Sequence, residues 1–209
     1  VIRAELAILG TDTELARRLL AWPGLSLADA LPLRVAGGLH WLHLAGRDER
    51  LAPIYRGTTT RQAEVDAIVA AVAADHDSTL VPWLDGPPQT NEAGRSSSLM
   101  AGLLWLARRL GPRFELNEIG ASAGVNTMMD RYHYDLAGVR IGPAASPMRL
   151  TPEWRGPPPP AEKVEIVAIR GCDVAPVDLA DRGEALRLKA YVWADAHERM
   201  ARIDAATTL

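Results

Sequence analysis

Apolar residues recur at helical spacing through the first 110 residues, and few of them alternate as they would in a half-buried strand. Helices are predicted over residues 14–20, 33–45, 62–74 and 95–110. Thr11-Asp12-Thr13 offers capping residues for the first helix, and Trp22-Pro23-Gly24 ends it. Residues 1–110 are therefore expected to form a helical N-terminal region packed on the remainder of the chain.

The pattern changes after Gly111 and Pro112, which end the fourth helix. Phe114, Leu116 and Ile119 indicate a short strand, followed by a glycine turn and a helix from Val125 to about Tyr132. A second apolar segment, residues 164–169, indicates another strand, and residues 184–206 indicate one long amphipathic helix. Alternating strands and helices over residues 111–209 predict an α/β fold.

The glycine turn is the first candidate site. Glu118-Ile119-Gly120-Ala121-Ser122-Ala123-Gly124 ends the first strand and opens the next helix. Small residues there let a ligand approach the backbone, free amide groups at the helix start can hold a polar ligand, and Glu118 can accept hydrogen bonds. The structural alternative is that the glycines only permit a tight turn, with Ser122 capping the helix.

This segment resembles the first motif of Rossmann-like S-adenosylmethionine methyltransferases, an acidic residue followed by alternating glycines. Ser122 stands where a middle glycine is usual. The resemblance implies a Rossmann-like, methyltransferase-like parallel sheet core in residues 111–209, with S-adenosylmethionine as cofactor. The residues that it implies for the cofactor are Glu118, Gly120, Ser122, Gly124, Asn126 and Asp173, of which Asp173 would bind the ribose. Because Asp173 lies far beyond the usual spacing of about 20 residues, residues 138–160 are read as an insertion.

The same turn also spells Gly-x-Ser-x-Gly, the nucleophile motif of α/β-hydrolases. Ser122, Asp173 and His197 follow one another in the chain order of that catalytic triad. A hydrolase sheet, however, places several strands before its nucleophile, whereas the residues before Ser122 are mostly helical in pattern. We therefore favour the methyltransferase interpretation over the hydrolase, and keep a non-catalytic binding protein as a third hypothesis.

A polar loop fixed by Pro87 and Pro88 is the candidate for substrate binding. Its side chains are those of Gln89, Thr90, Asn91, Glu92 and Arg95. Thr90 or Asn91 could instead cap the helix that follows.

Charge and composition limit the classes of binding partner that the sequence supports. A net charge of -3 without a dense Lys/Arg run gives no support for nucleic-acid binding, and no apolar run approaches the roughly 20 residues that span a bilayer. The single cysteine, Cys172, suits a reducing compartment, so a cytoplasmic protein is expected. The expected partner is a small-molecule substrate. His40 and His43 lie one helical turn apart, but no further ligand stands at metal-binding spacing, so no metal is expected. The oligomeric state is not indicated.

Several unusual strings occur together in the order of one bacterial family. They are residues 87–95, residues 118–126, Asp130-Arg131-Tyr132, Arg170-Gly171-Cys172-Asp173 and Tyr191-Val192-Trp193. From about Leu33 onward the chain resembles the family called domain of unknown function 2332. Members of that family are longer, so the resemblance implies that the α/β core is incomplete at its C-terminal end. It implies no particular reaction.

Overall fold

The computed structural model describes residues 1–209, which divide into two compact units. The helical unit contains Val1–Thr90 and Leu186–Ala196, and the sheet unit contains Asn91–Ala185 and His197–Leu209. The expected division lay at residue 110. The helix of residues 96–110 instead belongs with the sheet, because its residues Met100 and Leu104 are buried in the same core as Tyr134.

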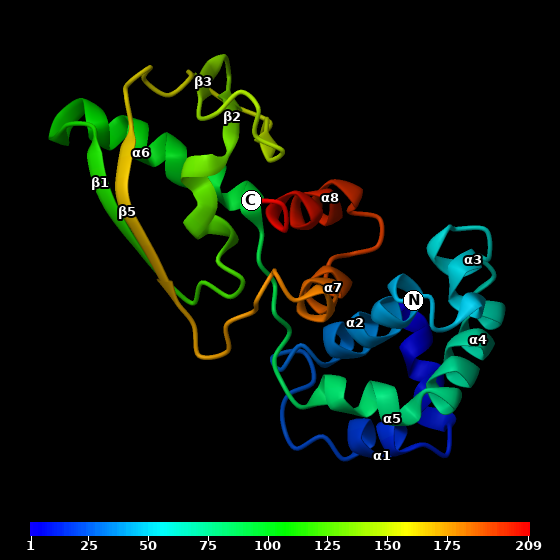
Figure 1. The fold of residues 1–209 in the computed structure, drawn as a ribbon. Coiled ribbons are helices and arrows are strands. Elements are labelled where there is room, and N and C mark those ends of the chain that lie inside the picture. Colours follow the sequence, from blue (N-terminus) through cyan, green and yellow to red (C-terminus); the bar gives the residue numbers. More distant parts are fainter. The chain divides into compact units, whose positions relative to one another are not determined.

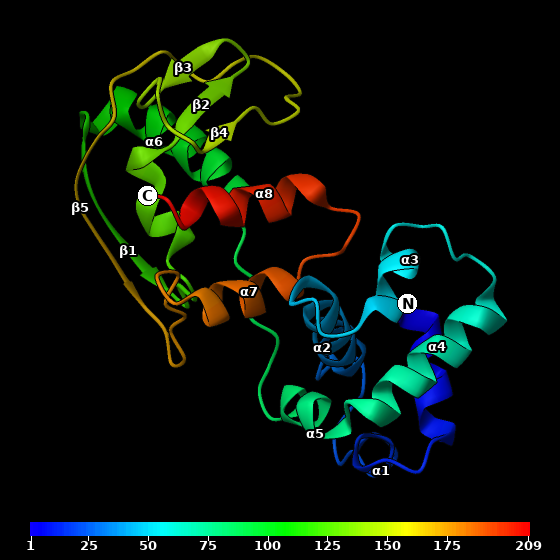
Figure 2. The same cartoon turned by 45° about the vertical axis from the view of Figure 1, so that its right-hand side comes forward.

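The helical unit is built from α-helices and 3₁₀ helices. Figure 2 shows α4 passing beside the N-terminal helix η1. In chain order they are η1 (Ile2–Gly10), α1 (Glu14–Leu20), α2 (Leu31–Leu44), η2 (Glu49–Leu51), α3 (Ala52–Tyr55), α4 (Gln62–Asp75), α5 (Asp77–Leu80) and η3 (Val81–Leu84), where η denotes a 3₁₀ helix. The three helices predicted in this unit are confirmed. The N-terminus of α1 is capped as predicted, since the Thr13 side chain accepts a hydrogen bond from the backbone N–H of Ala16.

The core of the helical unit is aliphatic, with Ile8, Leu39 and Val69 completely buried. Two glycines of α2 permit close packing: a Cβ on Gly37 would lie 2.7 Å from the Tyr191 ring, and one on Gly38 would lie 2.8 Å from Leu80. Side chains, among them the Tyr191 ring, therefore pack directly against the α2 backbone.

The sheet unit combines two small sheets with helices. Its elements are η4 (Ala93–Arg95), α6 (Ser96–Leu110), β1 (Arg113–Ile119), η5 (Val125–Arg131), β2 (His133–Leu136), β3 (Val139–Ile141), β4 (Arg149–Leu150), β5 (Glu165–Cys172) and α8 (His197–Ala206). Helix α7 (Arg182–Ala190) begins in this unit and ends in the helical unit.

The two predicted strands are confirmed and pair in parallel (Figure 1). Their register brings Glu118 opposite Gly171 and Ile119 opposite Cys172, so both strands end at the same edge. Alternate residues of β1, among them Phe114 and Leu116, pack into the core, while the residues between them are exposed. The protein is thus a mixed α/β chain, and this parallel sheet has two strands.

Residues 138–160 contain more regular structure than the predicted insertion implied. Strand β2 pairs antiparallel with β3 and parallel with β4, which gives a second sheet of order β3-β2-β4. Tyr134 lies on β2 and Tyr132 just before it. Their side chains are completely buried and donate hydrogen bonds to the carbonyls of Met129 and Val125, respectively. These bonds tie the small sheet to the η5 backbone.

The helix predicted after the glycine turn is present as the seven-residue 3₁₀ helix η5. The prediction of one long helix near the end of the chain was wrong. Residues 184–206 do not form one helix, because α7 ends at Ala190 and α8 begins at His197. Tyr191 leaves the helical path to pack edge-on against Trp83 at 5.3 Å, so burial of the aromatic ring overrides helix propensity there. No helix combines the length and apolar character needed to cross a bilayer.

Candidate functional site

The glycine turn between β1 and η5 has three residues in the left-handed region of backbone conformation. They are Gly120 (φ 73°), Ser122 (φ 53°) and Gly124 (φ 68°). Glycine adopts this conformation at little cost, whereas serine is strained in it. Something in the fold must therefore hold Ser122 in place.

The side chain of Asp173 supplies that restraint. Its carboxylate, just beyond β5, accepts hydrogen bonds from the backbone N–H groups of Ser122 (2.8 Å) and Ala175 (2.9 Å). The N–H groups of Ala175 and Ser122 lower the pKa of the Asp173 carboxyl, because they stabilise its charged form. Asp173 thus lies beside the turn. It follows β5, the strand that pairs with the strand of Glu118, and its carboxylate is hydrogen-bonded to the protein backbone.

The turn packs tightly over β5. A Cβ on Gly171 would lie 2.8 Å from the Ala121 Cβ and 2.9 Å from the Thr127 side chain. Over Gly120 the space is open, with no atom within 4 Å of a Cβ built there. The Gly120 side of the turn therefore leaves room for a ligand.

The expectation of free amide groups at the helix start was wrong. The N–H groups of Gly120 and Ala121 both donate to the Cys172 carbonyl, and that of Gly124 donates to the Ala121 carbonyl. The N–H of Val125, at the start of η5, donates to the Asn91 side chain (3.0 Å). With these donors satisfied internally, the turn is poorly suited to hold a phosphate.

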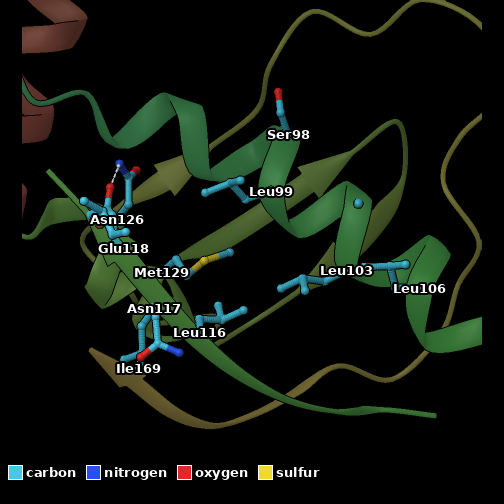
Figure 3. A pocket seen from close by; sticks show the side chains of 12 residues that line it. Ser98, Leu99, Leu103, Leu106, Leu116, Asn117, Glu118, Asn126, Met129 and Ile169 are labelled. Atoms are coloured by element: carbon cyan, nitrogen blue, oxygen red, sulfur yellow. Dashed lines mark hydrogen bonds between the residues drawn. The ribbon is translucent and has the colours of Figure 1, made fainter. Parts of the chain in front are cut away.

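A pocket of about 550 Å³ opens beside the turn, between α6 and β1 (Figure 3). Its walls are mainly apolar. Asn117, Glu118 and Asn126 place polar groups near the C-terminal end of β1, and Ser98 lies on α6. The lining residues are Ser98, Leu99, Gly102, Leu103, Leu106, Leu116, Asn117, Glu118, Ile119, Asn126, Met129 and Ile169. Its volume lies within the range of small-molecule sites, about 300 to 1,000 Å³.

Glu118 and Asn126 form the polar end of this pocket. The Asn126 Nδ2 donates to Glu118 Oε1 at 3.0 Å, the dashed line of Figure 3. The remaining oxygens, Glu118 Oε2 and Asn126 Oδ1, are buried without a hydrogen-bond partner. An unpaired buried acceptor costs roughly 1 to 3 kcal/mol, so this pair of oxygens favours a ligand that brings N–H or O–H donors.

The polar loop predicted to bind substrate is used largely for structure. Asn91 caps η5 through the Val125 N–H, rather than the helix that follows it in the sequence. Glu92 caps η4 by accepting from the Gly94 N–H (2.9 Å), and it forms ion pairs with Arg199 and Arg202 of α8. Burial raises the pKa of Glu92, but the Gly94 N–H and the two arginines outweigh it and lower the pKa overall.

The other residues of that loop are not among those that line the pocket. Arg95 is exposed at the end of η4, and Gln89 and Thr90 belong to the helical unit. Of all the predicted site residues, only Glu118 and Asn126 line the pocket.

The hydrolase residues do not form an evident triad. Ser122 is buried, with 8% of its surface exposed, whereas His197 is exposed at the start of α8. Asp173 binds the backbone N–H of Ser122 itself. A nucleophile turn needs its serine Oγ accessible to substrate, so this arrangement favours the hydrolase less than the nucleoside hypothesis.

Sequence reasoning missed the apolar wall that α6 contributes. Leu99 and Leu106 are half exposed on α6 although both are large and apolar, and Leu103 lies between them on the same helix face. The signal was present in the sequence, since these residues are spaced at three and four positions. It could not be distinguished from an ordinary core-facing stripe.

No group of three or more His, Cys, Asp and Glu side chains is placed to hold a metal ion. His40 and His43 instead stack on the Tyr55 ring, at centroid distances of 5.0 and 4.7 Å.

Fold and site together define a mixed α/β protein with a small-molecule-sized pocket at the end of a parallel strand. The family described as an uncharacterised protein conserved in bacteria, domain of unknown function 2332, matches residues 2–209, and the chain belongs to it. No curated protein and no solved structure matches the chain.

Proposed function

We propose that the chain binds S-adenosylmethionine, or a closely related nucleoside, and transfers its methyl group to a small molecule. The observation that carries the proposal is the pair of unpartnered buried oxygens, Glu118 Oε2 and Asn126 Oδ1, at the polar end of the pocket. S-Adenosylmethionine offers an ammonium, an amino group and ribose hydroxyls as donors. Glu118 would pair with the ammonium, and Asn126 would accept a second donor.

The state of the turn favours a nucleoside over a phosphorylated nucleotide. Its N–H groups at Gly120, Ala121 and Val125 are bonded within the protein, so none of these three is left for a phosphate. S-Adenosylmethionine has no phosphate. The open space over Gly120 leaves room for a ligand at the strand end.

Methyl transfer makes modest demands on side chains. The acceptor's lone pair forms the new bond to carbon, and the electrons of the S–CH₃ bond remain on sulfur, giving S-adenosylhomocysteine. The protein's contribution is to hold the two reactants in line, and a dedicated catalytic base is not required where the acceptor is already a nucleophile. The apolar surface of Leu103, Leu106 and Leu116 would receive the acceptor.

Calorimetric titration with S-adenosylmethionine, S-adenosylhomocysteine and 5′-methylthioadenosine tests this proposal. The last compound keeps the nucleoside but lacks the ammonium. We expect Glu118→Gln to weaken S-adenosylmethionine binding about tenfold, since a charge-assisted pair is lost, and to change methylthioadenosine binding little. Absence of heat with all three ligands at millimolar concentration would refute the proposal.

Glu115→Gln is the matched control. Glu115 lies on the same strand, on its exposed face, and its ion partner Arg170 is 3.9 Å away. The substitution removes the same charge from β1 without touching the pocket. Equal losses in the two variants would show that overall charge, rather than the Glu118 contact, governs binding.

A serine hydrolase is the second candidate, supported by the left-handed conformation of Ser122 in a strand-turn-helix segment. Its test is labelling with a fluorophosphonate. The hydrolase requires labelling of the wild type that disappears in Ser122→Ala, and an unlabelled wild type removes this candidate.

A further inference from the structure

A second pocket, of about 420 Å³, lies within the helical unit against η1, α1 and α2. Its walls are aliphatic, provided chiefly by Leu6, Leu9, Leu19, Leu31 and Val35. Among the lining residues Glu5 is the one acidic residue and Arg3 the one basic residue. A carboxyl group in such surroundings is costly, and its chemistry determines what the pocket can hold.

Glu5 is buried on η1, with 8% of its surface exposed, and its Oε1 has no hydrogen-bond partner. Burial raises the pKa of its carboxyl to about 8, and the nearby Val1 ammonium opposes the rise. Without a counter-charge in contact, the group is held mostly protonated at neutral pH. A cation in contact with the carboxyl group would stabilise its ionised form.

A second unsatisfied group lies close to Glu5. The Tyr55 hydroxyl is buried without a partner, and burial together with the charge of Glu5 raises its pKa. Stacking of the Tyr55 ring on His43 (4.7 Å) and His40 (5.0 Å) fixes its position. The interior of the unit thus holds an acceptor and a hydroxyl, both unpaired, beside an aliphatic pocket.

We propose that this pocket binds a small aliphatic primary amine, whose ammonium group pairs with Glu5 and whose hydrocarbon body lies on Leu6, Leu31 and Val35. An aliphatic carboxylate and a neutral alcohol both lack a positive charge that could stabilise the ionised form of Glu5. The amine offers both an ammonium for the Glu5 carboxylate and a hydrocarbon body for the apolar walls. The site lies in the helical unit and does not depend on the function proposed for the sheet unit.

Calorimetry on the full chain with n-hexylamine, n-hexanol and n-hexanoate tests the proposal. We expect the amine to bind most tightly, and to release close to one proton per bound amine near pH 7, because Glu5 ionises on pairing. Repeating the titration in two buffers of different ionisation enthalpy measures that proton. Equal binding of amine and alcohol without proton release would show an apolar pocket only and would overturn the proposal, as would no binding.

Three variants locate the effect. Glu5→Gln should weaken n-hexylamine binding about tenfold and abolish the proton release, while leaving n-hexanol binding unchanged. Leu6→Lys, at a pocket position 68% exposed and therefore safe for folding, should weaken the amine by placing an ammonium at the pocket rim. Glu14→Gln, exposed on α1 outside the pocket, should change nothing. Unchanged amine affinity in both Glu5→Gln and Leu6→Lys would contradict the assignment.

Discussion

The carboxylate of Asp173 holds the backbone N–H of Ser122 at 2.8 Å, across 51 residues of sequence. This bond joins the turn after β1 to the end of β5. It also keeps Ser122 in the left-handed conformation (φ 53°) that serine seldom adopts. Ser122 in turn accepts from the Val177 N–H through its carbonyl, so the two strand ends are joined in both directions.

Asp173→Ala is therefore expected to destabilise the sheet unit. It removes the acceptor of two backbone N–H groups, those of Ser122 and Ala175, and frees Ser122 to leave its strained conformation. Asp173→Asn keeps one acceptor oxygen and should lower the melting temperature less. Circular dichroism melts of the two variants beside Asp130→Ala, at an exposed position on η5, measure the effect. Equal melting temperatures for all three would show that the bond contributes nothing.

Substitution of two glycines should have opposite effects. Gly171→Ala places a methyl group 2.8 Å from Ala121 and 2.9 Å from Thr127, so the turn must move away from β5, at a cost of about 1 to 3 kcal/mol. Gly102→Ala, on α6, meets no atom within 4 Å and should stabilise the helix by about 1 kcal/mol. Urea unfolding of both variants gives the two changes. A stabilised Gly171→Ala would contradict the close approach of turn and strand.

Much of the local structure could be predicted because it depends on local signals. Four helices, both strands of the parallel sheet and the glycine turn follow from apolar spacing and from Gly and Pro positions. The break between α7 and α8 could not be predicted, since neither Gly nor Pro marks it. It depends on where the Tyr191 ring finds a partner, and that partner, Trp83, is more than a hundred residues away.

The site was predictable only in part. Glu118 and Asn126 were selected because they flank the turn, and both line the pocket. Asn91 was assigned to the substrate because its polar side chain stands in a loop fixed by two prolines. Asp173 was assigned to the ribose because it follows the second strand, as in the methyltransferase pattern. Each instead accepts a backbone N–H from a segment distant in sequence. Sequence spacing does not reveal which buried N–H groups need a partner, and only tertiary structure assigns the acceptors.

Glu92 should contribute to the stability of α8 in a pH-dependent way. Its pairs with Arg199 and Arg202 persist while it is ionised, so Glu92→Gln is expected to cost about 1 to 2 kcal/mol, discounted because both arginines are partly exposed. Because its folded pKa is lowered overall, this contribution is present above the ordinary glutamate pKa of 4.5 and disappears as pH falls through the lower folded value. Melting temperatures of wild type and variant should therefore converge as pH falls below 4.5 and through the lower folded pKa of Glu92. A constant difference would show that the pairs are not responsible.

Glu198→Gln tests whether this effect is particular to Glu92. Glu198 also pairs with Arg202, at 3.1 Å, but it is exposed. Screening by solvent should keep its contribution below about 0.5 kcal/mol. An effect as large as that of Glu92→Gln would show that the exposed carboxylate contributes as much to the free energy of unfolding as the buried one.

Glu5 should make the free energy of unfolding depend on pH in the opposite direction. Its carboxyl has a folded pKa of about 8 against 4.5 for an ordinary glutamate, so the folded protein binds the proton more tightly than the unfolded chain. The free energy of unfolding should accordingly fall as pH rises through that interval, by up to about 1.4 kcal/mol per pH unit, and level off above it. Glu5→Gln keeps the shape of the side chain and removes the titration, so its stability should be nearly flat over the same range. Urea unfolding of both proteins at several pH values measures this difference, and parallel curves for the two would mean that Glu5 is ionised and solvated in the folded state.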